Sequence, residues 1–68
     1  MASSEWTLHD DSKPYPNDTI DSGPETVIKA KYHRAVFTSQ IAPANAYIED
    51  PEGNQFEWNN GTSKWVEL

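Results

Sequence analysis

The chain has 68 residues, a net charge of −6 and no cysteine. This length allows one domain, and a domain so small buries only about 60% of its unfolded surface, so its own core leaves it marginally stable. The composition excludes a disulfide scaffold and a cysteine nucleophile, and the negative charge argues against nucleic acid as the main partner. Three Trp, three Tyr and two Phe provide most of the apolar surface. We therefore expect a thin aromatic core that another chain completes.

Residues 1–25 are predicted to form an extended N-terminal arm. Three prolines and Gly23 interrupt this segment, and no strand or helix periodicity persists in it. Large apolar side chains are nevertheless spaced along it, which a flexible tail generally lacks: Trp6, Leu8, Tyr15 and Ile20. Two interpretations remain open. The four side chains dock on a neighbouring subunit, or they fold back onto the domain's own sheet.

The first residues contain no signal for secretion. Met1-Ala2-Ser3-Ser4 has no basic residue, and no apolar run follows it. No stretch approaches the about 18 apolar residues of a membrane helix, so no membrane partner is expected. The chain is expected to be a product that remains, or is assembled, inside the cell.

Residues 26–38 fit two secondary structures. As a strand, the segment places Ile28, Tyr32 and Val36 on one face. As a helix, the same residues form a stripe with Ala35, and residues 22–25 match a capping box. The enrichment in Thr, Val, Ile, Tyr and Phe favours the strand, and the helix remains the alternative.

The same segment is the basic part of an acidic chain. Residues 1–26 carry six acids and one Lys, and residues 42–68 carry five acids and one Lys. Between them lie Lys29, Lys31 and Arg34 with no acid. This pattern indicates internal ion pairs, contact with an acidic surface, or a solvated face.

Two turns organise the last third of the chain. Asp50-Pro51-Glu52-Gly53 has the residue preferences of a type I turn, and Gly53 suits the bulge that closes such a hairpin. Asn60-Gly61 predicts a two-residue type I′ turn.

These turns predict two strand registers. The first turn places Ile48 opposite Phe56 and Ala46 opposite Trp58, and the second places Phe56 opposite Trp65. Both registers put the large apolar side chains on one face, and a slip of one residue would destroy that sorting.

The predicted fold is all-β. We expect a small antiparallel sheet or open barrel of about four strands over residues 26–68, behind the arm formed by residues 1–25. Its expected core consists of Ile28, Tyr32, Val36, Ile48, Phe56, Trp58 and Trp65.

No catalytic or cofactor motif is recognisable. The two histidines, His9 and His33, lie in segments with no nucleophile motif, and His9-Asp10-Asp11 lacks a second histidine at a metal-like spacing. The aromatic residues of the last third could stack on a sugar, but in so small a domain they are first of all the core. We expect no enzyme activity, no cofactor and no metal.

The run from Gly53 to Val66 resembles the aromatic, Asn-Gly and Trp-Val hairpins of bacteriophage virion proteins, such as fibre and capsid-decoration subunits. The resemblance covers residues 53–66 and carries no binding residues over. It implies a non-enzymatic virion protein, present in many copies, that clamps or decorates neighbouring subunits. Together with the lack of a signal peptide, this gives an expected location in the virion or the cytoplasm.

The expected partners are protein subunits of a larger assembly. The predicted binding residues are the four apolar side chains of the arm and the three basic residues: Trp6, Leu8, Tyr15, Ile20, Lys29, Lys31 and Arg34. Two alternatives remain: an acidic inhibitor that mimics nucleic acid, or an accessory subunit of a cellular complex. The basic segment argues against the mimic, which should be uniformly negative.

Overall fold

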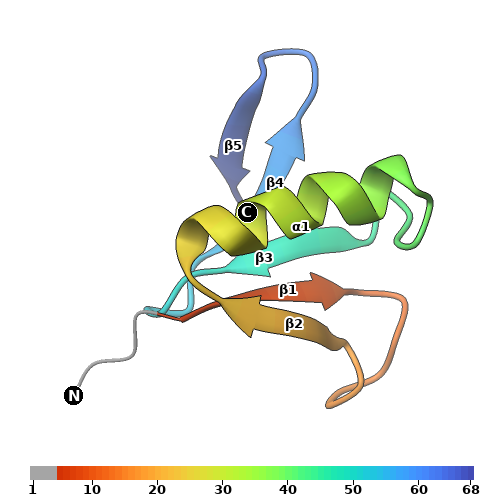
Figure 1. The fold of residues 1–68 in the computed structure, drawn as a ribbon, viewed down its shortest axis with the longest axis vertical. Helices are drawn as coiled ribbons and strands as arrows, with labels where there is room; N and C mark the ends of the chain where they lie inside the picture. The colour runs from red at the N-terminus through yellow and green to blue at the C-terminus, as the bar shows by residue number, and fades with distance from the viewer. Residues whose placement is uncertain (1–4) are drawn as a thin grey trace.

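The computed structural model describes residues 5–68. Its elements, in chain order, are β1 (Trp6–Asp10), β2 (Thr19–Gly23), α1 (Glu25–Phe37), β3 (Ala46–Glu49), β4 (Gln55–Asn59) and β5 (Lys64–Glu67). The five strands form one antiparallel sheet in the order β2-β1-β3-β4-β5, and α1 crosses over it (Figure 1). The predicted small antiparallel sheet is confirmed, with one strand more than expected and one helix.

The N-terminal segment belongs to the sheet, which corrects the expected arm. β1 lies between β2 and β3, with Leu8 opposite Ile48, and Leu8 is only 2% exposed. The sheet therefore runs across the expected boundary at residue 25. Residues 6–10 form a strand because Trp6 and Leu8 alternate with polar residues, which puts both apolar side chains on one face. This alternation is short, and the strand is stabilised by pairing with β3, which is distant in sequence. Residues 1–4, the start of the expected arm, lie outside the described residues.

Residues 25–37 form a helix, so the strand prediction for this segment is wrong. Its buried residues are Ile28, Tyr32 and Ala35, the stripe of the helical alternative, which packs on the sheet. The capping box does not form, because Pro24 occupies the N-cap and no side chain caps the helix there. Burial of the stripe overrides the strand preference of the β-branched residues.

The first predicted turn is confirmed. The Gly53 N–H donates to the Asp50 carbonyl at 3.0 Å, and Gly53 has a φ of 92°. The Asp50 carboxylate accepts hydrogen bonds from the backbone N–H groups of Glu52 (2.9 Å) and Asn54 (2.8 Å). This turn places Ile48 opposite Phe56, as the sequence predicts.

The second turn differs from the two-residue prediction. Asn59 pairs with Lys64, so a four-residue loop connects β4 and β5, and Trp58 rather than Phe56 lies opposite Trp65. The cause is the side chain of Asn59, which accepts hydrogen bonds from the N–H groups of Gly61 (2.8 Å) and Thr62 (3.2 Å). The register changes by two residues, so every side chain stays on its predicted face.

The core lies between α1 and one face of the sheet. Its buried members are Leu8, Ile28, Tyr32, Ala35, Ile41, Ala46 and Ile48, and half-buried apolar side chains pack around them. Of the predicted core residues, Ile28, Tyr32 and Ile48 are buried, whereas the others are half-buried against this cluster: Val36, Phe56, Trp58 and Trp65.

Candidate protein-binding site

A cleft forms where the β4–β5 hairpin leaves the rest of the sheet. β3 and β4 pair only at Ile48 with Phe56 and at Glu49 with Gln55. Beyond these pairs the hairpin turns away from β1, β2 and β3 and extends past α1, across the direction of the helix (Figure 1). Trp58 and Trp65, which share the apolar face of the hairpin, therefore meet side chains of the helix.

An aromatic cluster joins the helix to the hairpin. The rings of His33 and Trp58 meet edge to face, with 4.7 Å between their centroids. Tyr32 and Trp65 meet in the same way, with 4.8 Å between centroids. Trp58 and Trp65 contact each other at 5.3 Å. Edge-to-face contacts at these distances are favourable beyond the area that they bury, so the cluster fixes one wall of the cleft.

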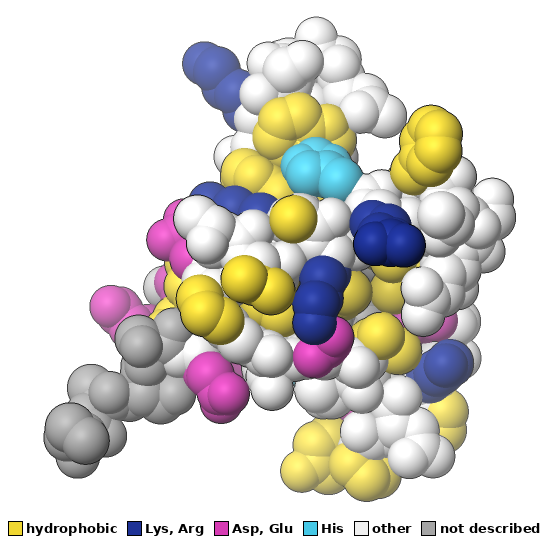
Figure 2. Space-filling model, viewed as in Figure 1, with side chains coloured by type: hydrophobic (Ala, Val, Ile, Leu, Met, Phe, Trp, Pro, Cys, Tyr) yellow, Lys and Arg dark blue, Asp and Glu magenta, His cyan; other side chains and the backbone are white. Residues whose placement is uncertain are grey.

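We call this concavity the helix–hairpin cleft. It has a volume of about 480 Å³ and is lined by Tyr32, His33, Arg34, Val36, Phe37, Trp58 and Asn60. Phe37 at the end of α1 is 90% exposed. Figure 2 shows the hollow on this side of the molecule, with hydrophobic side chains and a histidine along its border. A volume of this size is typical of binding pockets, and the exposed ring of Phe37 adds apolar area beside it.

One cation of the helix remains available to a partner. Lys29 pairs with Glu25 at 2.6 Å, and Lys31 pairs with Asp21. The guanidinium of Arg34 makes no ion pair or hydrogen bond with residues 5–68, and Arg34 is exposed. Arg34 also borders a second apolar hollow along α1, together with Val27 and Ala30. The cleft thus has one unpaired positive charge at its border.

The residues predicted to bind a partner are dispersed by the fold. Leu8 is buried, and Trp6 and Ile20 pack against the core. Lys29 lies over the ring of Trp6 at 5.2 Å as well as beside Glu25. Only Tyr15 and Arg34 are both exposed and free of such contacts, and Tyr15 lies in the loop between β1 and β2, outside the cleft lining.

The sequence reasoning missed three cleft residues, namely His33, Phe37 and Asn60. The signal for Phe37 was its place outside the helical stripe of Ile28, Tyr32 and Ala35, which leaves a large aromatic ring without a place in the core. This signal is weak in the sequence, because the β-branched and aromatic residues of the segment favour a strand over the alternative helix.

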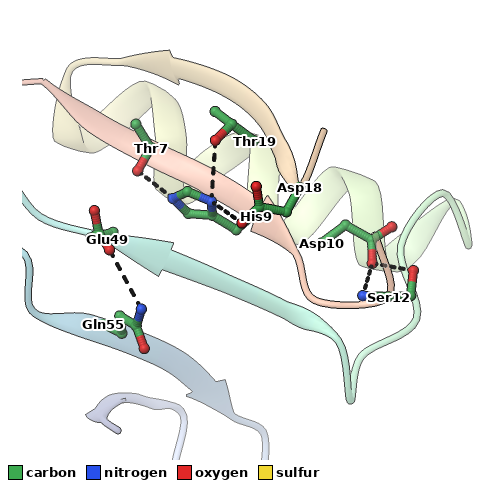
Figure 3. Close-up of polar contacts among 8 residues, drawn as sticks. All are labelled: Thr7, His9, Asp10, Ser12, Asp18, Thr19, Glu49 and Gln55. Carbon is green, nitrogen blue, oxygen red and sulfur yellow. Dashed lines mark hydrogen bonds and ion pairs between the residues drawn. The ribbon is translucent and has the colours of Figure 1, made fainter. Parts of the chain in front are cut away.

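A polar cluster lies on the face of the sheet turned away from α1. The Thr7 hydroxyl lies 2.7 Å from Nε2 of His9, and Asp18 Oδ2 lies 3.5 Å from Nδ1 (Figure 3). The Thr19 hydroxyl lies 3.4 Å from the same nitrogen. This order of hydroxyl, imidazole and carboxylate resembles a nucleophile with its base.

Packing gives this cluster a structural role. The His9 ring stacks on Tyr47 at 4.8 Å between ring centroids, and His9 is only 8% exposed, so both of its nitrogens lie next to side chains of this chain. Burial raises the pKa of Tyr47, and the carboxylates of Asp18, Asp11 and Glu49 add to this. We interpret the cluster as a link between β1, β2 and β3.

Residues 5–68 contain no group of three or more His, Cys, Asp or Glu side chains arranged to hold a metal ion. Within the same range, no helix has the length and apolarity to cross a membrane. Comparisons with protein-family models, with curated proteins and with solved structures found no match to this chain.

Proposed function

We propose that this chain is a non-enzymatic protein-binding subunit that docks on another protein of an assembly through the helix–hairpin cleft. The observation that carries the proposal is the position of Phe37. Its side chain is 90% exposed and borders a concavity of about 480 Å³ whose wall contains Trp58. Aromatic residues, Phe among them, are enriched at protein interfaces relative to the rest of the surface.

The rest of the fold supports a binding role for this face. The aromatic cluster that shapes the cleft is held by a hydrogen bond between α1 and β4, so the cleft is formed before a partner arrives. A preformed site avoids part of the ordering cost of binding. The proposal replaces the arm as the binding element, because β1 and β2 are integral to the sheet.

We extend the proposal to assembly in many copies, as a decoration or cement subunit of a virion. This extension rests on the resemblance of residues 53–66 to hairpins of bacteriophage virion proteins. The cleft itself is a feature that any protein-binding subunit could use.

The test is to isolate the tagged full chain with its natural assembly, using wild type, Phe37→Ser and the matched control Val66→Ser. Val66 is also an exposed apolar residue, but it does not line the cleft. We expect a complex of fixed stoichiometry with wild type and with Val66→Ser, and a free monomer with Phe37→Ser. A complex that all three chains retain, or a wild type that is always monomeric, would show that the proposal is wrong.

The salt dependence of binding distinguishes this proposed function from the alternative, an acidic inhibitor that mimics nucleic acid. An apolar anchor with a single ion pair predicts a binding constant that changes little with salt, whereas a mimic that uses many carboxylates loses affinity steeply. The same complex, measured at low and high ionic strength, distinguishes the two.

A further inference from the structure

We infer that the segment held in the helix–hairpin cleft combines one large apolar side chain with a neighbouring carboxylate. This inference rests on the proposed function and adds the chemistry of the partner. It comes from three properties of the cleft: its apolar interior, its single unpaired cation and one free amide donor.

The apolar interior selects the anchor. Val36, Phe37 and Trp58 supply apolar surface, and the ring of His33 lies edge-on against Trp58. An aliphatic or aromatic side chain that enters this space removes apolar area from water on both sides, which is the main driving force of such contacts. A polar side chain would lose its hydration without a matching set of partners.

Arg34 selects the carboxylate. Its guanidinium makes no ion pair or hydrogen bond with the described residues, whereas Lys29 and Lys31 are each held by a carboxylate of this chain. A guanidinium can bind a carboxylate through two parallel hydrogen bonds, and such bonds are stronger than neutral ones. The partner's Asp or Glu must therefore lie within reach of the anchor, because Arg34 lines the same cleft.

Asn60 favours a peptide backbone as the carrier of both groups. Its side-chain oxygen accepts a hydrogen bond from Nε1 of Trp58 at 2.8 Å. This bond orients the amide, and its NH₂ group makes no hydrogen bond with residues 5–68, so it can donate to a carbonyl. An extended segment offers such carbonyls beside its side chains.

The charges argue against a second copy of this chain in a symmetric dimer through the cleft. A two-fold contact would repeat the same surface on both sides and bring the two unpaired Arg34 side chains towards each other. The described lining residues of the cleft include no acid that could neutralise them.

The experiment selects a display library of random peptides on the wild-type chain, with counter-selection on Phe37→Ser. We expect enriched peptides to contain a large apolar residue within a few positions of Asp or Glu. Arg34→Gln should weaken a selected peptide about tenfold. The control Lys64→Gln removes one exposed positive charge outside the cleft and should leave the affinity unchanged. Circular dichroism verifies that each variant is folded.

Four results would overturn the inference. Enriched peptides without a carboxylate, or with an affinity that Arg34→Gln does not change, would leave the cleft as a binding site but refute the chemistry. Failure to enrich any peptide that distinguishes wild type from Phe37→Ser would refute the inference, and the isolated natural complex would then decide the proposed function separately. A dimer of the free chain that Phe37→Ser dissociates would place a second copy in the cleft.

Discussion

The hydroxyl of Tyr32 in α1 accepts a hydrogen bond from the backbone N–H of Trp58 in β4, at 3.1 Å. This hydrogen bond links the helix to the β4–β5 hairpin, whose strand β4 pairs with β3 at only two positions. The residues are 26 positions apart in sequence. This contact therefore holds the two walls of the cleft together.

Replacing Tyr32 by Phe should loosen the hairpin. The aromatic ring stays, but the Trp58 N–H loses its partner, and we expect the free energy of unfolding to fall by about 1 kcal/mol. Urea denaturation measures the loss, and amide exchange at Trp58 should become faster. Tyr15→Phe is the matched control, since Tyr15 is 88% exposed. Equal stability of both variants would show that the hydrogen bond is not important.

Leu8→Ala tests whether the N-terminal segment is part of the core. Leu8 is 2% exposed in β1, which lies between β2 and β3, and removal of such a side chain typically costs about 2–5 kcal/mol. This is close to the whole stability of a small domain, so we expect a largely unfolded chain by circular dichroism. Tyr15→Ala should change the free energy of unfolding by less than about 0.5 kcal/mol. A folded Leu8→Ala chain would favour the arm instead.

Stability should fall at acidic pH because of turn carboxylates. Burial raises the pKa of Asp50, but hydrogen bonds from Asn54, Glu52 and Gly53 outweigh it, so the pKa lies below its ordinary value of 3.8. The folded state therefore holds this proton less tightly than the unfolded state. The resulting stabilisation is fully present above the ordinary pKa and is lost as the pH falls through the folded value.

Urea midpoints measured from neutral pH to below 3.8 test this dependence. Asp50→Asn should be less stable than wild type at neutral pH and should lose less stability on acidification. Glu52→Gln, which changes an exposed carboxylate in the same turn, should follow the wild-type profile. Asp10 and Asp21 should add to the same loss of stability at acidic pH, because the pKa of each is also lowered in the folded state. Hydrogen bonds from Ser12 lower the pKa of Asp10, and the hydrogen bond from Lys31 lowers that of Asp21.

Gly53→Ala should destabilise the β3–β4 hairpin. Gly53 has a φ of 92°, where an L-residue is strained, although no atom lies within 4 Å of an added Cβ. The cost is therefore conformational, about 1–2 kcal/mol. Gly23→Ala is the control, because its added Cβ meets only Val27 at 4.0 Å and no positive φ is required. A thermal melt that shows the same shift for both would contradict this explanation.

Local turn chemistry made part of the fold predictable. Asp50 and Gly53 determine the first hairpin through contacts within four residues, so the pairing of Ile48 with Phe56 followed from the sequence. The alternation of apolar residues also placed Phe56, Trp58 and Trp65 on the correct face. Both features depend on residues close together in the sequence, so they can be predicted from one sequence alone.

The remaining elements depend on distant partners. β1 alternates over only a few residues, and β2 contains a single large apolar residue, Ile20, so neither pattern is recognisable before the strands pair. The helix of residues 25–37 was only the alternative, because the enrichment of this segment in β-branched and aromatic residues favours a strand. The cleft could not be predicted, because it arises from the angle between α1 and the β4–β5 hairpin.

The two-residue difference in the β4–β5 register has a practical consequence. Since orientation repeats with every second position along a strand, the tip between Asn59 and Lys64 can be lengthened or shortened by pairs of residues while both tryptophans still point at the helix. A label or a short epitope is therefore best inserted after Thr62, because Asn60 lines the cleft and Asn59 holds the first part of the loop.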